Sequence, residues 1–142
     1  MAIVSTASNH FKYQLASKKI DFASDTFKII LMNDTFTFNK DTHSTLSGVT
    51  DYQLTTGSGY TQNEKALEGV SVTEDDTNDR AYVTWDDVTW TSTGSIGPIG
   101  ALIIYDDDTD DDTVVGCTDF GSDYTVTSGN SIQIQQIMAY IN

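Results

Sequence analysis

The sequence predicts an all-β fold, a single antiparallel β-sandwich or jelly roll with one short N-terminal helix. The chain has 142 residues, which is enough for one hydrophobic core but not for two. After Gly69, about six short apolar segments alternate with polar turns, a pattern typical of antiparallel sheets. Hydrophobic residues make up 38% of the chain and aromatic residues 11%, so we do not expect global disorder. We therefore expect residues 1–142 to form one β-rich domain.

An N-terminal helical arm is predicted for residues 1–24, with its helix at about residues 8–19. The side chain of Ser8 or Asn9 can accept a hydrogen bond from a free backbone N–H of the first turn. Phe11 and Leu15 are four residues apart and fall on one helix face. A helix this short needs a surface on which to lie, because isolated helices of this length are marginal in water.

The segment from Thr26 to Met32 predicts a strand that is buried on both sides. Alternate residues of a strand point to opposite faces, and here both sets are apolar. One set is Phe27, Ile29 and Leu31, and the other is Ile30 and Met32. We expect the helix to cover one of these faces.

Residues 33–68 form an irregular excursion without clear secondary structure. The run Thr56–Tyr60 contains two glycines, a threonine and a serine, which is loop chemistry. A loop this long is uncommon in a small domain unless it has a function. We therefore expect the excursion to reach a partner.

The second half of the chain predicts hairpins with acidic turns. Residues 70–85 form the first hairpin, followed by a bulge at residues 86–87. Residues 101–105 are the most apolar run and predict the central strand. Residues 119–123 predict a turn. The last strand alternates up to Tyr140 if no bulge intervenes, with Ile132 and Ile134 facing the core beside Ile103.

Charge is segregated along the chain, whose formal net charge is -14. All six lysines lie at or before Lys65, where six acids balance them, and Arg80 is the only base among the fifteen acids from Glu68 to Asp123. This pattern fits a protein that docks by a neutral end and shows an acidic end to solvent, and it fits equally a free monomer from a salty habitat.

The composition argues against several classes of protein. A surface this negative repels phosphate backbones and anionic lipids, so we expect neither nucleic acid nor a membrane as a partner. No apolar run approaches the ~20 residues that span a bilayer. The start of the chain lacks the basic and apolar regions of a signal peptide, which predicts synthesis in a cytoplasm. Cys117 is the only cysteine, and we expect a buried thiol rather than a disulfide.

Catalytic motifs are not found, and we predict that the protein is not an enzyme. His10 lies in the expected helix and His43 in the irregular excursion, and neither lies near a nucleophile motif. One cysteine and two separated histidines cannot build a zinc site. The glycines do not form a phosphate-binding loop, so we expect no cofactor.

One acidic run resembles part of a calcium loop. Asp106, Asp108 and Asp110 have the spacing of the first three ligands of an EF-hand, but Asp111 stands where that loop needs glycine. The bidentate glutamate at the twelfth position is also missing. We favour a solvated turn whose repulsion is relieved by bulk cations, and we expect no ordered Ca²⁺ of micromolar affinity within residues 106–112.

The order of short segments along the chain resembles small virion structural proteins of tailed bacteriophages, which occur as capsid-associated or decoration proteins. The resembling segments span most of the chain, although similar proteins usually lack the acidic run at residues 106–112. They are Phe11–Ala16, Phe27–Met32, Thr56–Thr61, Asp87–Trp90, Gly100–Tyr105 and Gly116–Gly121.

The resemblance implies a non-enzymatic decoration or cement protein that binds a bacteriophage head as a homo-oligomer. The major capsid protein or other virion proteins would be its partners, and the virion its location after synthesis in the host cytoplasm. We expect the helix and the excursion to face the capsid and the acidic turns to face outward. The expected interface residues are Phe11, Leu15, Lys18, Lys19 and Tyr60.

Three other functions are compatible with the sequence. A neck, tail or fibre-base component would share most of these features. A Ca²⁺-dependent carbohydrate-binding β-sandwich, such as a virion adhesin, would use the acidic run for the metal and Trp90, Tyr105 or Tyr124 for sugar stacking. A small hydrolase is the third, and it would need His43 or a carboxylate pair in a buried pocket.

Overall fold

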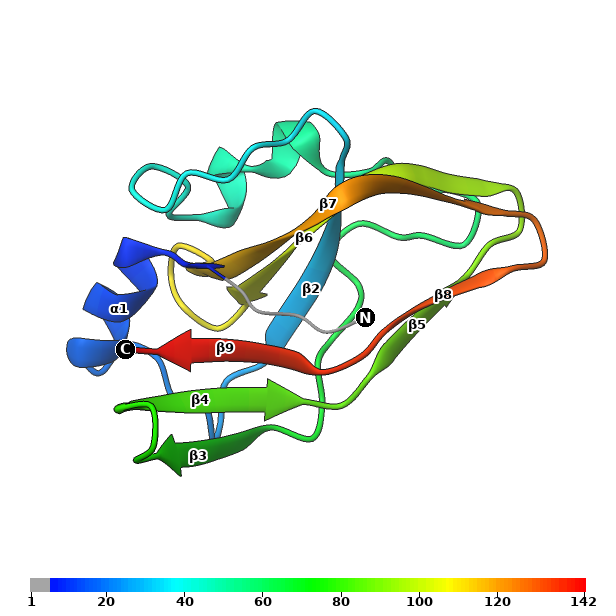
Figure 1. Cartoon of the computed structure of the whole chain (residues 1–142). Helices are drawn as coiled ribbons and strands as arrows, with labels where there is room; N and C mark the ends of the chain where they lie inside the picture. The colour runs from blue at the N-terminus through cyan, green and yellow to red at the C-terminus, as the bar shows by residue number, and fades with distance from the viewer. Residues whose placement is uncertain (1–5) are drawn as a thin grey trace.

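The computed structural model describes residues 6–142 and shows antiparallel sheets with one α-helix (Figure 1). The predicted all-β fold with a short N-terminal helix is therefore confirmed. The first five residues of the expected arm at 1–24, which also belong to the segment used to argue against a signal peptide, lie outside the described residues.

The strands form three groups. A four-stranded sheet has the order β1-β7-β6-β2, a three-stranded sheet has the order β3-β4-β9, and β5 pairs with β8. The strands of the first sheet are β1 (Thr6–Ala7), β2 (Phe27–Asn33), β6 (Ser95–Asp106) and β7 (Val114–Thr127). Those of the second are β3 (Ser71–Asp75), β4 (Arg80–Trp85) and β9 (Ile137–Ile141). The third group is β5 (Val88–Thr91) and β8 (Ser131–Ile134).

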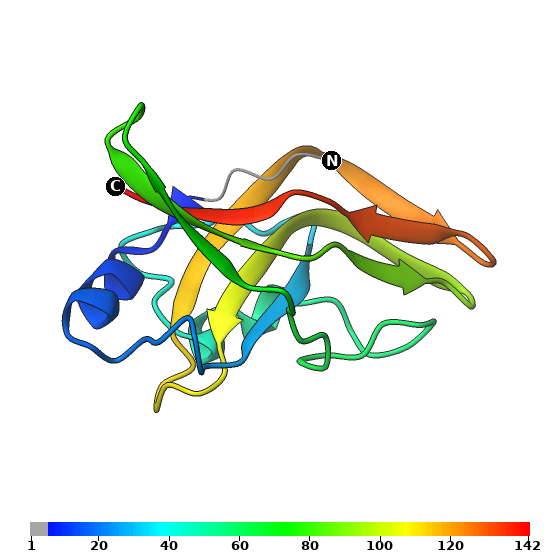
Figure 2. The same cartoon turned by 90° about the horizontal axis from the view of Figure 1, so that it is seen from below.

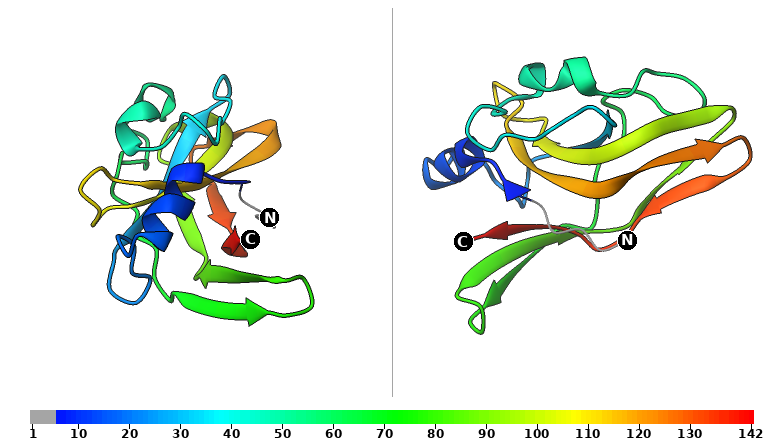
Figure 3. Two further views of the ribbon diagram at one scale, coloured as in Figure 1. Left: turned by 90° about the vertical axis from the view of Figure 1, so that its left-hand side faces the viewer. Right: turned by 45° about the horizontal axis from the view of Figure 1, so that its top comes forward.

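The sheets form two layers that face each other across the main core. The pair β5–β8 extends the layer of β4 and β9 and then turns into β6 and β7, so the layers meet at one end of the molecule (Figure 3). Apolar side chains from both layers fill the space between them. They include Phe27, Ile29, Leu31, Trp85, Trp90, Leu102, Ile104, Ile134 and Ile137.

The helix α1 (Asn9–Ala16) begins where the sequence predicts. The N–H of Phe11 donates to the hydroxyl of Ser8 at 2.9 Å, which caps the first turn. The helix ends earlier than expected, because Lys18 adopts a φ of 60° that stops the right-handed turn. Phe11 is fully buried and its ring lies 6.0 Å from that of Phe22. The helix therefore packs against the domain core through Phe11.

Both faces of β2 are buried, as predicted. The helix does not cover either face by itself. One face belongs to the main core, and the other packs in a second cluster with Phe36 and Val49 of the excursion. Two short 3-10 helices, η1 (Leu46–Gly48) and η2 (Thr50–Tyr52), lie over this side of the sheet (Figure 1). The first part of residues 33–68 thus covers the second face of the sheet, whereas Tyr60 and Leu67 join the main core. The expectation that the excursion reaches a partner is not needed to explain its length.

The hairpin β3–β4 and the central position of β6 are confirmed. The expected turn at residues 119–123 is wrong, because β7 runs through it with shifted register. The expectation that Ile134 packs in the core beside Ile103 is also wrong. Ile103 faces the second cluster, whereas Ile134 faces the main core. A break at Gln136, which has a φ of 54°, divides the last strand into β8 and β9.

Candidate functional site

The acidic turn between β6 and β7 lies directly against the N-terminal helix. Nε2 of His10 lies 2.7 Å from Oδ2 of Asp111. Nζ of Lys28 lies 3.1 Å from Oδ2 of Asp107. The helix and the acidic turn therefore occupy the same end of the molecule, and the expected arrangement with the helix facing the capsid and the acids facing outward is wrong.

The expected interface residues divide into buried and exposed groups. Phe11 is fully buried and Tyr60 is 2% exposed, so neither side chain is available to a partner and both expectations are wrong. Tyr60 instead accepts a hydrogen bond from the N–H of Leu31 at 3.0 Å. Leu15 is half-buried against the core. Lys18 and Lys19 are exposed.

The two exposed lysines line a cavity with the acidic turn. This cavity has a volume of about 450 Å³, and its lining residues are Gln14, Lys18, Lys19, Asp108, Thr109, Asp110 and Asp111. The lysines therefore lie close to the acids that sequence position alone had assigned to the opposite end.

Three carboxylates gather at the base of the acidic turn. Asp25, Asp106 and Asp108 each present one oxygen, and these oxygens lie within 4.8 Å of one another. Asp110 is exposed and does not belong to this group. Of the three residues named from the sequence, Asp106 and Asp108 therefore belong to this group and Asp110 does not. Asp25 was missed, because it comes from the segment before β2, far away in the sequence.

Backbone hydrogen bonds fix this arrangement. The N–H of Asp107 donates to the carbonyl of Thr26 at 2.9 Å, and the N–H of Thr26 donates to Oδ2 of Asp108. The N–H of Asp21 donates to Oδ2 of Asp25 at 2.9 Å. The segment before β2 and the turn after β6 are therefore joined by their backbones as well as by the carboxylates.

Asp106 is the unusual member of the group, because its side chain is fully buried. Its Oδ1 accepts a hydrogen bond from the N–H of Asp108 at 2.9 Å, whereas its Oδ2 is buried without a hydrogen-bond partner. Burial, together with the neighbouring carboxylate of Asp25, raises the pKa of Asp106 to about 8. Near neutral pH this carboxyl therefore retains a proton unless another positive charge takes its place.

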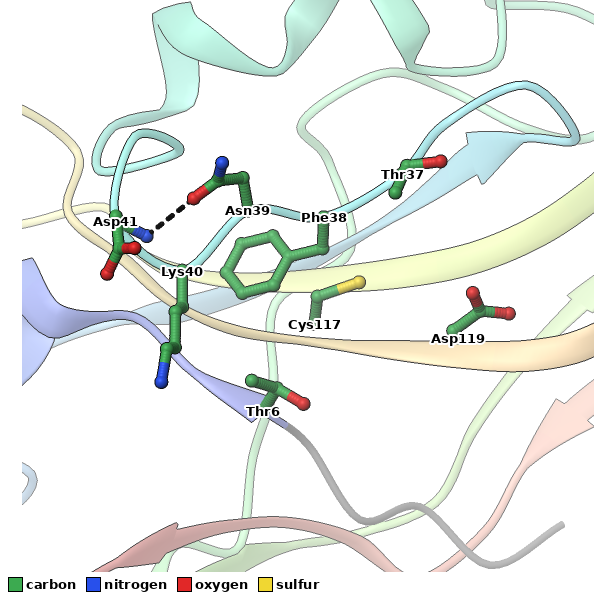
Figure 4. Close-up of a pocket in the computed structure, with 8 residues that line it drawn as sticks. All are labelled: Thr6, Thr37, Phe38, Asn39, Lys40, Asp41, Cys117 and Asp119. Atoms are coloured by element: carbon green, nitrogen blue, oxygen red, sulfur yellow. Dashed lines mark hydrogen bonds between the residues drawn. The ribbon is translucent and has the colours of Figure 1, made fainter.

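The cavity shown in Figure 4 lies between β1, β7 and the segment 37–41. It has a volume of about 490 Å³ and is lined by Thr6, Thr37, Phe38, Asn39, Lys40, Asp41, Cys117 and Asp119. Burial, with a smaller contribution from Asp119, raises the pKa of the Cys117 thiol to about 12. The thiol is therefore protonated at neutral pH and is a poor nucleophile.

The histidines and most of the aromatic candidates make structural contacts. Nδ1 of His43 accepts a hydrogen bond from the N–H of Asn39 at 3.0 Å. Trp90 is 3% exposed and Tyr105 is fully buried, so the expectation that they stack on a sugar is wrong. Tyr124 is 42% exposed, but its partner on β6 is Ile99, seven positions from Asp106.

The turns at the opposite end of the molecule contain no charged residue. Three turns meet there, at residues 55–59, 91–95 and 127–131, and we call them the uncharged end. Their fifteen residues are all Ser, Thr, Gly or Asn. The N–H of Thr93 donates to the carbonyl of Ser58 at 2.9 Å, and the N–H of Ser92 donates to the carbonyl of Asn130 at 2.8 Å. Apart from Ser58 and Ser92, these residues are exposed.

The uncharged end is part of a larger charge-free region. No Asp, Glu, Lys or Arg occurs at residues 52–63, 88–105 or 124–142. Figure 1 shows the turns of the uncharged end opposite α1, the acidic turn after β6 and the β3–β4 turn. The acidic turns are therefore gathered at one end of the folded molecule, and the charge-free turns lie at the other.

None of the helices among residues 6–142 has the length and apolar character needed to cross a lipid bilayer. Comparisons of the chain with known protein families, with curated proteins and with solved structures find no match.

Proposed function

We propose that this protein is a non-enzymatic structural protein of a bacteriophage virion, a decoration or cement protein that binds the head through its uncharged end. The resemblance of its segments to such proteins supports the virion, and the neck, tail and fibre base remain other possible places on it. The uncharged end is the observation that carries the proposed docking mode.

The physical reason is electrostatic. A protein with a net charge of -14 repels other copies of itself and any negatively charged shell. This repulsion is smallest when the charge-free turns form the contact, because the acids then lie at the far end. Exposed hydroxyl and amide groups at residues 55–59, 91–95 and 127–131 can hydrogen-bond to a protein surface without the cost of burying a charge.

The contacts of the other candidate residues support a non-enzymatic role. His10 and His43 contact Asp111 and the backbone of Asn39, and Cys117 holds a protonated thiol. These arrangements fix loops and fill the core. Among residues 6–142, no hydrogen bond joins either histidine to a serine or cysteine that it could activate as a nucleophile.

We also propose that the protein acts as a homo-oligomer on the particle. The edge strand β3 offers unpaired backbone groups and two exposed valines to a second copy, since Val72 is 56% and the adjoining Val70 39% exposed. Glu74 and Asp75 of the same strand oppose this contact, so it needs enough salt to screen them. Sedimentation of the isolated chain measures this association, and Val72→Lys should weaken it. A monomer with unchanged mass at all concentrations would contradict this part of the proposal.

Binding to particles tests the function. Purified phage particles that lack the protein are mixed with the full chain and sedimented, and we expect saturable binding. A chain that never sediments with particles would overturn the virion assignment. Electron cryo-microscopy of the decorated particle then shows which end forms the contact.

A matched pair of variants tests whether the uncharged end forms the contact, separately from whether the protein binds the virion at all. Thr93→Asp adds one negative charge to the uncharged end, and Thr77→Asp adds the same charge to the exposed β3–β4 turn. We expect about a tenfold or greater loss of particle binding for Thr93→Asp only, which is ~1.4 kcal/mol. Equal binding by both variants would reject the uncharged end as the contact and leave the virion assignment standing.

A further inference from the structure

We propose that Asp25, Asp106 and Asp108 form a binding site for a divalent cation with a preference for oxygen ligands, and that Ca²⁺ fits it best. The site would join the segment before β2 to the turn between β6 and β7. This inference does not depend on the proposed function.

The buried oxygen of Asp106 is the main observation. No N–H or hydroxyl group donates to Oδ2 of Asp106, although the side chain is fully buried and interacts with the carboxylate of Asp25. A buried carboxylate oxygen without a partner is costly, and a second carboxylate beside it increases the cost. Either a proton or a cation can remove that cost. A divalent cation bound among the three carboxylates neutralises more of their negative charge than a single proton does.

The geometry suits Ca²⁺ better than Mg²⁺. Ca–O distances of about 2.3–2.6 Å place opposite ligands up to about 5 Å apart. The three carboxylate oxygens lie within 4.8 Å of one another, which is inside that span. Mg²⁺ demands near-ideal octahedral geometry and is usually held by one or two carboxylates, so a set of three carboxylates suits Ca²⁺ better.

The cation would strengthen a junction that already exists. The backbone bonds between Thr26 and residues 107 and 108 bring the two segments together without metal. Three protein carboxylates are fewer ligands than an EF-hand supplies, so water must complete the shell. We therefore expect a dissociation constant on the order of 10⁻⁴ M rather than micromolar affinity.

Thermal unfolding of the full chain tests the site. The protein is freed of metal with a chelator and then unfolded in excess Ca²⁺, in excess Mg²⁺ and in NaCl of the same ionic strength. We expect Ca²⁺ to raise Tm by roughly 5 °C, Mg²⁺ by less, and NaCl least. Calorimetry should give one Ca²⁺ per chain.

Substitutions in the same turn provide the control. Asp106→Asn and Asp110→Asn remove the same charge, but only Asp106 belongs to the group of three. We expect Asp106→Asn to abolish the Ca²⁺-specific rise in Tm and Asp110→Asn to keep it. If Asp106→Asn does not fold, Asp25→Asn serves instead, because Asp25 is only half-buried.

Three results would overturn the proposal. Equal shifts in Ca²⁺ and NaCl would mean that cations act only by screening. Equal shifts in both variants would place any bound Ca²⁺ elsewhere. No response to Ca²⁺ in a well-folded protein would mean that Asp106 simply holds a proton.

Discussion

Asp106 and Cys117 show how burial determines the chemistry of single residues in this protein. Both lie on strands of the four-stranded sheet, and burial raises the pKa of both, to about 8 and about 12. The surroundings of the two groups differ, and so does the chemistry that each group can take part in. Asp106 lies among carboxylates that a cation can share, whereas Cys117 lies in an apolar cluster that favours a neutral thiol.

The reactivity of Cys117 follows from its raised pKa. The thiolate is the reactive form, and a thiol with a pKa of about 12 is almost wholly protonated at pH 8. We expect iodoacetamide to label Cys117 at pH 8 at least ~100-fold more slowly in the folded protein than in denaturant. Mass spectrometry over time measures the two rates. Fast labelling of the folded chain would contradict the burial of this side chain.

At the scale of elements, the turns of the uncharged end are packed tightly against one another. Gly59 has a φ of 100°, and a Cβ at this position would clash with the carbonyl oxygen of Thr91. Gly129 has a φ of 84°, but no atom lies within 4 Å of the position of its Cβ. The two glycines therefore share the left-handed backbone and differ in the space around them.

These glycines provide a matched test of the packing. Gly129→Ala should cost only the strain of a left-handed alanine, about 1–2 kcal/mol. Gly59→Ala should cost about 2 kcal/mol more, because the Thr91 backbone must also move. Chemical denaturation of both variants measures the difference in the free energy of unfolding. Equal costs would show that the turns at residues 55–59 and 91–95 do not touch as described.

At this scale, the pattern of neighbouring residues in the sequence predicted most of the helices and strands. It could not predict which segments far apart in the sequence contact one another. The alternation around Ile29 and the cap at Ser8 depend only on neighbouring residues, and both are confirmed. The faces of Ile103 and Ile134 depend on which layer each strand joins, which alternation does not reveal. Asp25 meets Asp106 only through the pairing of β2 with β6. No spacing rule connects residues that lie so far apart in the sequence.

At the scale of the whole molecule, charge opposes folding at one end. Acids of the β3–β4 turn and of the turn after β6 lie at the end that carries α1 (Figure 2). Only part of this charge is offset: among residues 6–142, Lys28 pairs with Asp107 and His10 lies beside Asp111, whereas the other four acids of the turn make no ion pair. Their mutual repulsion is screened by salt.

Stability should therefore rise with salt even without divalent ions. Between about 10 mM and 500 mM NaCl the Debye length falls from about 30 Å to about 4 Å, so repulsion among the exposed acids is reduced. We expect Tm, measured with a chelator present, to rise by a few degrees. The rise should be smaller in the double variant Asp76→Asn/Asp110→Asn, because both residues are exposed acids at this end. A Tm that falls with salt would contradict net repulsion.

The position of the β3–β4 turn has a practical consequence for peptide display. This turn spans residues 76–79, all of which are exposed, and it projects at the end opposite the uncharged one (Figure 2). Exposed turn tips tolerate insertions, because few contacts depend on them. A peptide inserted after Asn78 would leave the strands of the hairpin intact. On a particle bound through the uncharged end, every copy would present that peptide outward, in a regular array suited to an epitope or an affinity tag.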